Sequence, residues 1–211
     1  MSQYHIIFED KSIIVIDKPS GMLVIPTPKG ETNTLSHLIN DELNSRGEEV
    51  NAYPCHRIDR ETSGLIIFAK GKKNQQEIMK QFEERLVKKS YIAFIHGSLR
   101  QDHGVLKSYG KSKYDNYKRL MITQYRVVTR RPGFTVVKAK PITGRTNQLR
   151  IQFKEISHPI LGESVYAFRK DFSLKFRRLA LHSYKISFVH PMTKELVEYT
   201  SEIPEDMKGL L

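Results

Sequence analysis

The feature that most limits what this chain can fold into is an unbroken apolar run from Leu65 to Ala69, bounded by Gly64 and by Lys70 and Gly71. An apolar run of this length between turn-forming residues is typical of a strand that is buried on both faces. Such a strand needs other elements to cover it, and a chain of 211 residues is long enough to build a sizeable core. We therefore expect the run to lie inside the core, as part of a sheet.

Strand patterns dominate the remaining sequence. Residues 90–97 alternate between two sides, with Tyr91 and Ile95 on one side and Ile92 and Phe94 on the other. Two strands joined by a polar turn are predicted at residues 4–8 and 13–16. The second half of the chain adds predicted strands at residues 125–128, 134–139, 181–189 and 196–200, the last two joined by a turn.

Only two long helices are predicted. The first begins with Thr34 as a cap and carries an apolar stripe formed by Leu35, Leu38, Ile39 and Leu43. The second covers residues 72–86, with apolar side chains at every fourth position: Ile78, Phe82 and Leu86. Few helices beside many hairpin-linked strands favour an α+β protein built on a largely antiparallel sheet. No linker or repeat interrupts the sequence, so we expect a single domain over residues 1–211.

The charge of the chain is concentrated in one segment. The sequence has 35 Lys and Arg residues against 23 Asp and Glu residues, a net charge of +12. Residues 107–150, the basic sector, contain twelve basic residues and one acid, Asp115, so this sector alone carries +11. A clustered positive charge of this size favours a polyanionic partner.

Several classes of protein are disfavoured. The longest apolar runs are far shorter than the roughly 20 residues that span a bilayer, and the first residues do not open a signal peptide. We therefore expect a cytoplasmic protein with no membrane partner. The one cysteine, Cys55, cannot form an internal disulfide, and no second cysteine stands at a zinc-ligand spacing from it. We expect no metal site.

A short segment just before the buried run concentrates ionisable groups. From His56 to Glu61, five of six residues are ionisable, and Asp59 lies among them. One interpretation is a solvated loop in which Asp59 pairs with Arg57 or Arg60. The other is a carboxylate at the mouth of a sheet, held ionised by arginines. Spacing alone does not decide between these two interpretations.

A second polar cluster covers residues 141–150. Thr146 can cap a short helix bearing Leu149, Phe153 and Ile156, and Arg145 and Arg150 then lie around its first turns. Because arginines oppose the macrodipole at a helix N-terminus, an anion is the functional reason to place them there. The alternative is an ordinary basic surface turn. The position at the end of the basic sector favours the functional interpretation.

The segment from His56 to Leu65 closely resembles the signature of the RluA family of RNA pseudouridine synthases, in which the aspartate is catalytic. Four further blocks are similar to that family and follow in order along the chain: residues 17–23, 89–93, 143–150 with 158–162, and the pairs at 181–182 and 190–191. Together the five blocks span most of the sequence.

The resemblance implies the pseudouridine synthase catalytic fold and an isomerase that converts specific uridines in structured rRNA or tRNA to pseudouridine without a cofactor. It also implies that catalysis rests on Asp59, Tyr91 and Arg150, with Arg150 as the cation beside the aspartate. The planar guanidinium of Arg150 can hold both oxygens of Asp59. Without the resemblance, Tyr91 reads as an ordinary core tyrosine on a strand. One departure is Asn147, which stands where the family usually has histidine. Asparagine keeps a hydrogen-bonding side chain but cannot carry charge.

RNA binding is expected to use side chains from both motifs and from the basic sector: His56, Arg57, Lys111, Lys113, Lys118, Arg119 and Arg145. Tyrosines alternate with the basic residues and can stack on unpaired bases: Tyr109, Tyr114, Tyr117 and Tyr125. The sequence offers no room before Tyr4 for a separate RNA-binding domain, and no exposed apolar helix face predicts obligate assembly. We therefore expect a monomer.

Two other classes remain as alternatives. A non-catalytic RNA-binding or ribosome-assembly protein would use the same basic sector, but it has no reason to keep Asp59, Tyr91 and Arg150 together. A hydrolase acting on nucleosides or nucleic acid would also use a carboxylate. The hydrolase predicts free uracil or cut strands on incubation with RNA, and the synthase predicts neither.

Overall fold

The structure is a computed structural model that describes residues 4–111, 117–167 and 174–211. The chain divides into two compact units, which are described separately. Unit 1 comprises residues 1–88 and 183–202, and unit 2 comprises residues 89–182 and 203–211. Lys113 and Tyr114 of the basic sector lie outside the described residues. Within the described part of the chain, no helix is both long and apolar enough to cross a membrane.

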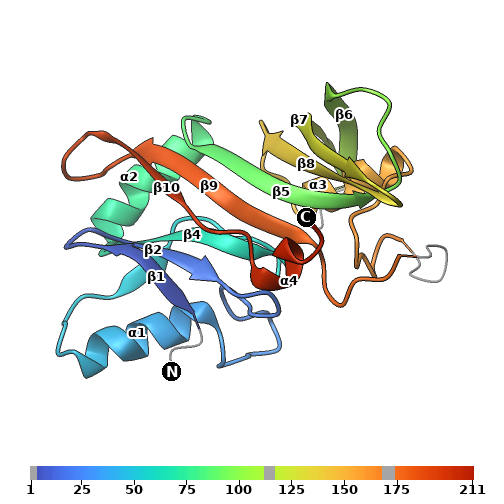
Figure 1. Cartoon of the computed structure of the whole chain (residues 1–211). Coiled ribbons are helices and arrows are strands. Elements are labelled where there is room, and N and C mark those ends of the chain that lie inside the picture. Colours follow the sequence, from blue (N-terminus) through green and yellow to red (C-terminus); the bar gives the residue numbers. More distant parts are fainter. Residues whose placement is uncertain (1–3, 112–116, 168–173) are drawn as a thin grey trace. The chain divides into compact units, whose positions relative to one another are not determined.

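Unit 1 contains a sheet with the strand order β1-β2-β4-β9, in which β3 also pairs with β4 and β10 with β9. The pairs β1–β2, β2–β4, β3–β4 and β9–β10 are antiparallel. Two helices lie beside this sheet, α1 (Leu35–Ser45) and α2 (Lys72–Glu83) (Figure 1). The strands are β1 (His5–Glu9), β2 (Ile13–Lys18), β3 (Ala52–Pro54), β4 (Ser63–Lys70), β9 (Leu181–Val189) and β10 (Leu196–Thr200).

The predicted buried run forms the centre of unit 1. Every residue from Leu65 to Ala69 is fully buried, as expected for a strand covered on both faces. Leu65 and Ile67 pack in a core cluster with Ile78 of α2 and with Cys55, which follows β3. This packing places the polar segment that precedes β4 at the end of a rigid strand.

Unit 2 contains an antiparallel sheet with the strand order β5-β8-β7-β6. The helix α3 (Gln148–Glu155) lies against this sheet, and a short helix, α4 (Glu205–Lys208), ends the chain (Figure 1). The strands are β5 (Lys88–His96), β6 (His103–Lys111), β7 (Lys118–Arg131) and β8 (Phe134–Pro141).

The predicted α+β class with a largely antiparallel sheet is confirmed. The first predicted helix is also present, with the Thr34 hydroxyl accepting a hydrogen bond from the His37 N–H at 3.4 Å. The second predicted helix is too long. It ends at Glu83, because Arg85 adopts a left-handed conformation (φ 59°), and Leu86 is half exposed.

The β6–β7 hairpin was only partly predicted. The sequence indicated a strand at residues 125–128, but β7 begins at Lys118 and its residues 118–126 pair with β6. Glycines 104 and 110 obscure the alternation of β6, yet Gly104 is required there. A Cβ at this position would come within 2.8 Å of the Tyr125 ring.

Candidate active site

The segment bearing Asp59 is a loop between β3 and β4 in unit 1, and residues 18–21 hold its backbone. The Ser20 hydroxyl donates to the Glu61 carbonyl at 2.6 Å. The Gly21 N–H donates to the Arg60 carbonyl at 2.8 Å, and Arg60 Nε donates back to the Gly21 carbonyl at 2.9 Å. Two of the sequence blocks therefore form one local structure, in which Asp59 is half-buried.

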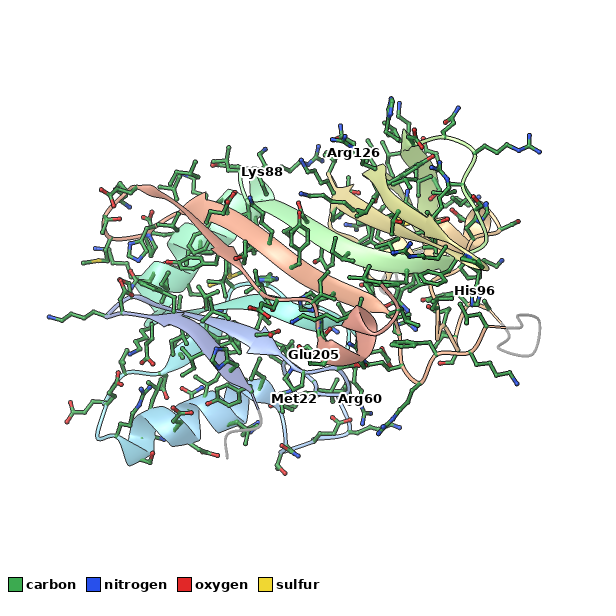
Figure 2. The ribbon with its side chains drawn as sticks, viewed as in Figure 1. Met22, Arg60, Lys88, His96, Arg126 and Glu205 are labelled. Atoms are coloured by element: carbon green, nitrogen blue, oxygen red, sulfur yellow. The ribbon has the colours of Figure 1, made fainter. Side chains whose placement is uncertain are left out.

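Lys18 is the buried centre of this structure. Its side chain is fully buried, and Nζ donates to the carbonyls of Pro19 (2.8 Å), Met22 (2.9 Å) and Arg60 (3.2 Å). Figure 2 shows Met22 and Arg60 near one another at this end of unit 1. A buried ammonium is tolerated only when its donors are matched by acceptors. Lys18 thus ties the residue after Asp59 to the end of β2.

The glycine that follows this loop is explained by close packing against β9. Gly64 has φ +108°, and a Cβ there would lie 2.3 Å from the Ser183 carbonyl oxygen. A side chain fits neither the backbone conformation nor the space. The β4 strand therefore begins in a fixed position directly after the Asp59 loop.

The two residues before Asp59 that were predicted to bind RNA differ in their surroundings. His56 Nε2 accepts the Ile67 N–H at 3.1 Å, and its ring lies 4.8 Å from that of Phe82. His56 Nε2 thus acts as an acceptor for the β4 backbone. Arg57, in contrast, is exposed. RNA binding by either residue stays a prediction.

Tyr91 lies on the face of the unit 2 sheet that α3 covers. Tyr91 pairs with Ala139, and Ala139 pairs with Tyr125 on the next strand, so the three side chains share one face. The Tyr125 ring packs against Phe153 of α3, with 6.5 Å between the centroids. Because α3 also carries Arg150, two of the three predicted catalytic residues belong to this layer of unit 2.

Arg150 forms a buried ion pair that the sequence did not predict. Its Nε donates to Glu163 Oε2 at 2.7 Å and its Nη2 donates to Glu163 Oε1 at 2.8 Å, and the two side chains are 3% and 1% exposed. The anion expected near the start of this helix is thus Glu163. The Nε–Nη2 edge of the guanidinium is thus occupied by Glu163.

The start of α3 also differs from the prediction. Thr146 is not the cap; the helix begins after Asn147, which has a left-handed conformation (φ 54°) and caps no N–H with its side chain. Asparagine tolerates this conformation better than most residues. The Asn147 amide instead donates to the Tyr166 hydroxyl at 2.7 Å, and its Oδ1 lies 3.5 Å from Arg150 Nη1.

The basic sector presents its residues on both faces of the β6–β7 hairpin. Lys118 pairs with Lys111 and Arg119 pairs with Gly110, so the side chains of Lys118 and Arg119 belong to opposite faces. Tyr109 and Tyr117 are 63% and 75% exposed, as stacking on bases requires. Tyr125 is buried and packs against Phe153, so its stacking on bases stays a prediction. Arg145 is exposed near the start of α3.

The sequence did not predict two buried residues that hydrogen-bond the candidate site residues or their backbone, Gln148 and Glu163. Gln148 is buried, accepts from the Thr143 hydroxyl and the Arg145 N–H, and donates to Ile122 and Thr123. Gln148 is a polar residue inside the block at residues 143–150, and this position could have indicated it. Glu163 lies just outside the block at residues 158–162. In the described part of the chain, no three His, Cys, Asp or Glu side chains gather as metal ligands.

Comparison with known sequences identifies related proteins. A sequence model described as RNA pseudouridylate synthase matches residues 12–155. The chain is 36% identical to a dual-specificity RNA pseudouridine synthase RluA from Pasteurella multocida, over 93% of this chain and 91% of that protein. It is 31% identical to a ribosomal large subunit pseudouridine synthase D from Nitrosomonas europaea, over 98% of this chain and 64% of the relative.

Solved structures agree on the fold. The human RNA pseudouridylate synthase domain containing 4 superposes with a TM-score of 0.79 at 21% identity, covering 96% of this chain and 90% of that one. The sequence relatives match nearly the whole chain, including the loop with Asp59 and the strand with Tyr91. The chain therefore belongs to the RluA family of RNA pseudouridine synthases, and it is an isomerase that acts on RNA.

Proposed function

We propose that this enzyme isomerises specific uridines in structured rRNA or tRNA and that its reaction uses Asp59, Tyr91 and Arg150. The bond from ribose C1′ to uracil N1 breaks, the base turns, and a bond forms from C1′ to C5. The hydrogen lost from C5 is balanced by one gained at N1, so the product is an isomer. The reaction needs no oxidant or energy source, and we propose that no cofactor takes part.

Asp59 is the proposed carboxylate that acts on the sugar or base as the glycosidic bond breaks. When bound RNA excludes water, burial alone would favour the neutral acid, so a fixed cation is needed to keep the carboxylate ionised. The family resemblance assigns that task to Arg150. The observation that carries this proposal is the buried, two-point immobilisation of the Arg150 guanidinium on the sheet layer that also bears Tyr91.

Tyr91 is the proposed contact for the extracted uracil. Its ring can stack on the base, and its phenol can accept or donate a proton when C5 exchanges hydrogen. The target base must first leave its stack, at a cost of a few kcal/mol, because C1′ and C5 are inaccessible in paired RNA. Arg57, exposed before the catalytic loop, is placed in sequence to fill the vacated space or bind the adjacent phosphate.

The remaining expectations concern where and with what the enzyme works. We propose that His56, Lys111, Lys113, Lys118, Arg119 and Arg145 join Arg57 in binding RNA, because the basic sector supplies phosphate contacts beside exposed tyrosines. The relative named for the ribosomal large subunit supports a cytoplasmic enzyme with no membrane partner. Three residues of the apolar stripe of α1, Leu35, Ile39 and Leu43, are buried within unit 1, which supports a monomer.

The first test replaces the proposed catalytic carboxylate. We expect Asp59→Asn to abolish pseudouridine formation, because the amide is nearly isosteric but cannot act as a nucleophile or base. RNA affinity should stay within about two-fold of the unmodified enzyme, since the charge lost is a single acid. The measurement combines pseudouridine mapping of treated RNA with a filter-binding assay.

A matched control is Asp41→Asn, which changes an exposed aspartate on α1. It should leave both the rate and the affinity unchanged. Wild-type rates from Asp59→Asn would overturn the proposal. Free uracil or strand cleavage by the unmodified enzyme would instead favour a hydrolase.

A further inference from the structure

Glu163 is held more firmly than an ion-pair partner needs to be. Besides the two bonds to Arg150, its Oε1 accepts backbone N–H groups from Ser164 (2.9 Å), Val165 (2.8 Å) and Tyr166 (3.3 Å). Burial alone would raise the pKa of Glu163, but the bonds from Arg150 and the backbone outweigh it, and the pKa lies below its ordinary value. Glu163 is therefore a carboxylate fixed by hydrogen bonds from the Arg150 guanidinium and from three backbone N–H groups.

The backbone that carries Glu163 is itself anchored within unit 2. The Leu161 N–H donates to the Phe94 carbonyl at 2.7 Å, and the Leu161 carbonyl accepts from Ala180 at 2.9 Å. Gly162 has φ +75°, and a Cβ there would lie 1.7 Å from the Arg178 carbonyl oxygen. The carboxylate thus approaches Arg150 from a segment that cannot shift without breaking these contacts.

The other side of the guanidinium also has a defined boundary. Asn147 Oδ1 lies 3.5 Å from Nη1, and the Asn147 amide is fixed by its bond to the Tyr166 hydroxyl. The Tyr166 ring lies 5.5 Å from Arg150 Cζ, within the range of a cation–π contact. Glu163 at Nε and Nη2, Asn147 near Nη1 and the Tyr166 ring together form a bracket around Arg150.

We propose that Glu163 is a positioning residue for the isomerisation, fixing the plane and direction of the Arg150 guanidinium, with Asn147 and Tyr166 completing the bracket. The inference rests on the proposed function, in which Arg150 acts in the reaction. Stability alone does not account for the bracket, because an apolar pair of similar volume is commonly as stable as a buried ion pair. What an apolar pair cannot supply is an oriented cation.

The test is a double-mutant cycle on Arg150 and Glu163. We expect Glu163→Gln to lower the single-turnover rate at saturating RNA by about ten-fold or more, with RNA affinity within about two-fold. In an Arg150→Met background, the same Glu163→Gln change should have no further effect on the rate, since Glu163 acts through Arg150. Glu155→Gln, an exposed change on the same helix, is the matched control and should leave the rate unchanged.

The outcomes separate the inference from the proposed function. A wild-type rate for Glu163→Gln, or an equal loss in both backgrounds, overturns the positioning role. A wild-type rate for Arg150→Met overturns the proposed function instead. If Glu163→Gln does not fold, as a melting curve will show, Tyr166→Phe decides. This change removes the hydroxyl that holds Asn147, and an unchanged rate in an otherwise unmodified enzyme overturns the bracket.

Discussion

Two cationic side chains of the proposed site are buried. Lys18 supports the Asp59 loop, Arg150 is itself a proposed catalytic residue, and the two differ in the groups that neutralise or accept from them. Lys18 in unit 1 donates to three backbone carbonyls, whereas Arg150 in unit 2 pairs with the carboxylate of Glu163. Removing one partner of a buried charge lowers the stability of the fold far more than replacing both partners by apolar residues does. Both residues are therefore expected to be sensitive to substitutions that keep their size.

Lys18→Met is the corresponding prediction for the Asp59 loop. The change keeps the length of the side chain but leaves three carbonyls without their donor, so we expect the free energy of unfolding to fall by about 3 kcal/mol. The rate of pseudouridine formation should fall as well, because the Arg60 carbonyl is released. Urea unfolding measures the first effect and a single-turnover assay the second.

The control for this prediction is Lys11→Met, which changes an exposed lysine in the turn before β2. It should alter the free energy of unfolding by less than about 0.5 kcal/mol. Equal stability of Lys18→Met and Lys11→Met would contradict the assigned role of Lys18.

Sequence reasoning at the residue scale found the side chains proposed for the chemistry and missed those that hold them. Asp59 and Arg150 lie in polar segments that stand out against apolar surroundings. The partner of Lys18 at Arg60 is 42 residues away, and the partner of Arg150 is 13 residues away. Pairs at such separations depend on how the strands and loops are brought together, so one sequence cannot indicate them.

At the scale of elements, the β6–β7 hairpin shows how a binding surface escapes a pattern search. Its outward positions include Lys107, Tyr109 and Arg126, and its inward positions include Gly104 and Met121. Glycine and long basic side chains weaken the apolar alternation on which strand prediction depends. The buried run of β4 had no such interruption and was predicted within two residues.

Neutralising the hairpin tests the role of the basic sector. We expect the combined substitution of Lys111, Lys118 and Arg119 by Gln to weaken RNA binding and to make the slope of log K against log salt less negative by about two to three. The reason is that each phosphate contact releases counterions on binding, so a variant with fewer contacts releases fewer of them. Affinity measured across a series of salt concentrations gives the slope directly.

The matched control replaces Lys73 and Lys80 by Gln on α2, where basic and acidic side chains mix on a solvated face. This pair should leave the slope unchanged. An unchanged slope in the hairpin variant would mean that its charge serves solubility rather than RNA binding.

At the scale of the whole molecule, the division into two units was not visible in the sequence. Two of the three boundaries, after Lys88 and after His182, fall inside strands β5 and β9, and the third follows Glu202, two residues beyond the end of β10. A search for glycine-rich or proline-rich linkers therefore had nothing to find. The basic sector belongs entirely to unit 2, whereas Asp59 belongs to unit 1. The single domain over residues 1–211 that the sequence led us to expect stays a prediction.

Cys55 offers a way to follow unit 1 alone. It is the one cysteine of the chain, it lies in the core cluster of that unit, and burial raises the pKa of its thiol to about 12. We expect no reaction with a disulfide reagent at pH 8 over many minutes, since the thiol is both hidden and protonated. A fast reaction of the folded protein would contradict this expectation.

The consequence is that Cys55 is an intrinsic probe of how often unit 1 opens. Because labelling requires the core around Cys55 to open, its rate in dilute urea reports how often unit 1 opens, without a mutation or an attached probe. Repeating the measurement with RNA present will show whether substrate slows that opening, and so how strongly binding is coupled to the stability of the part of the chain that carries Asp59.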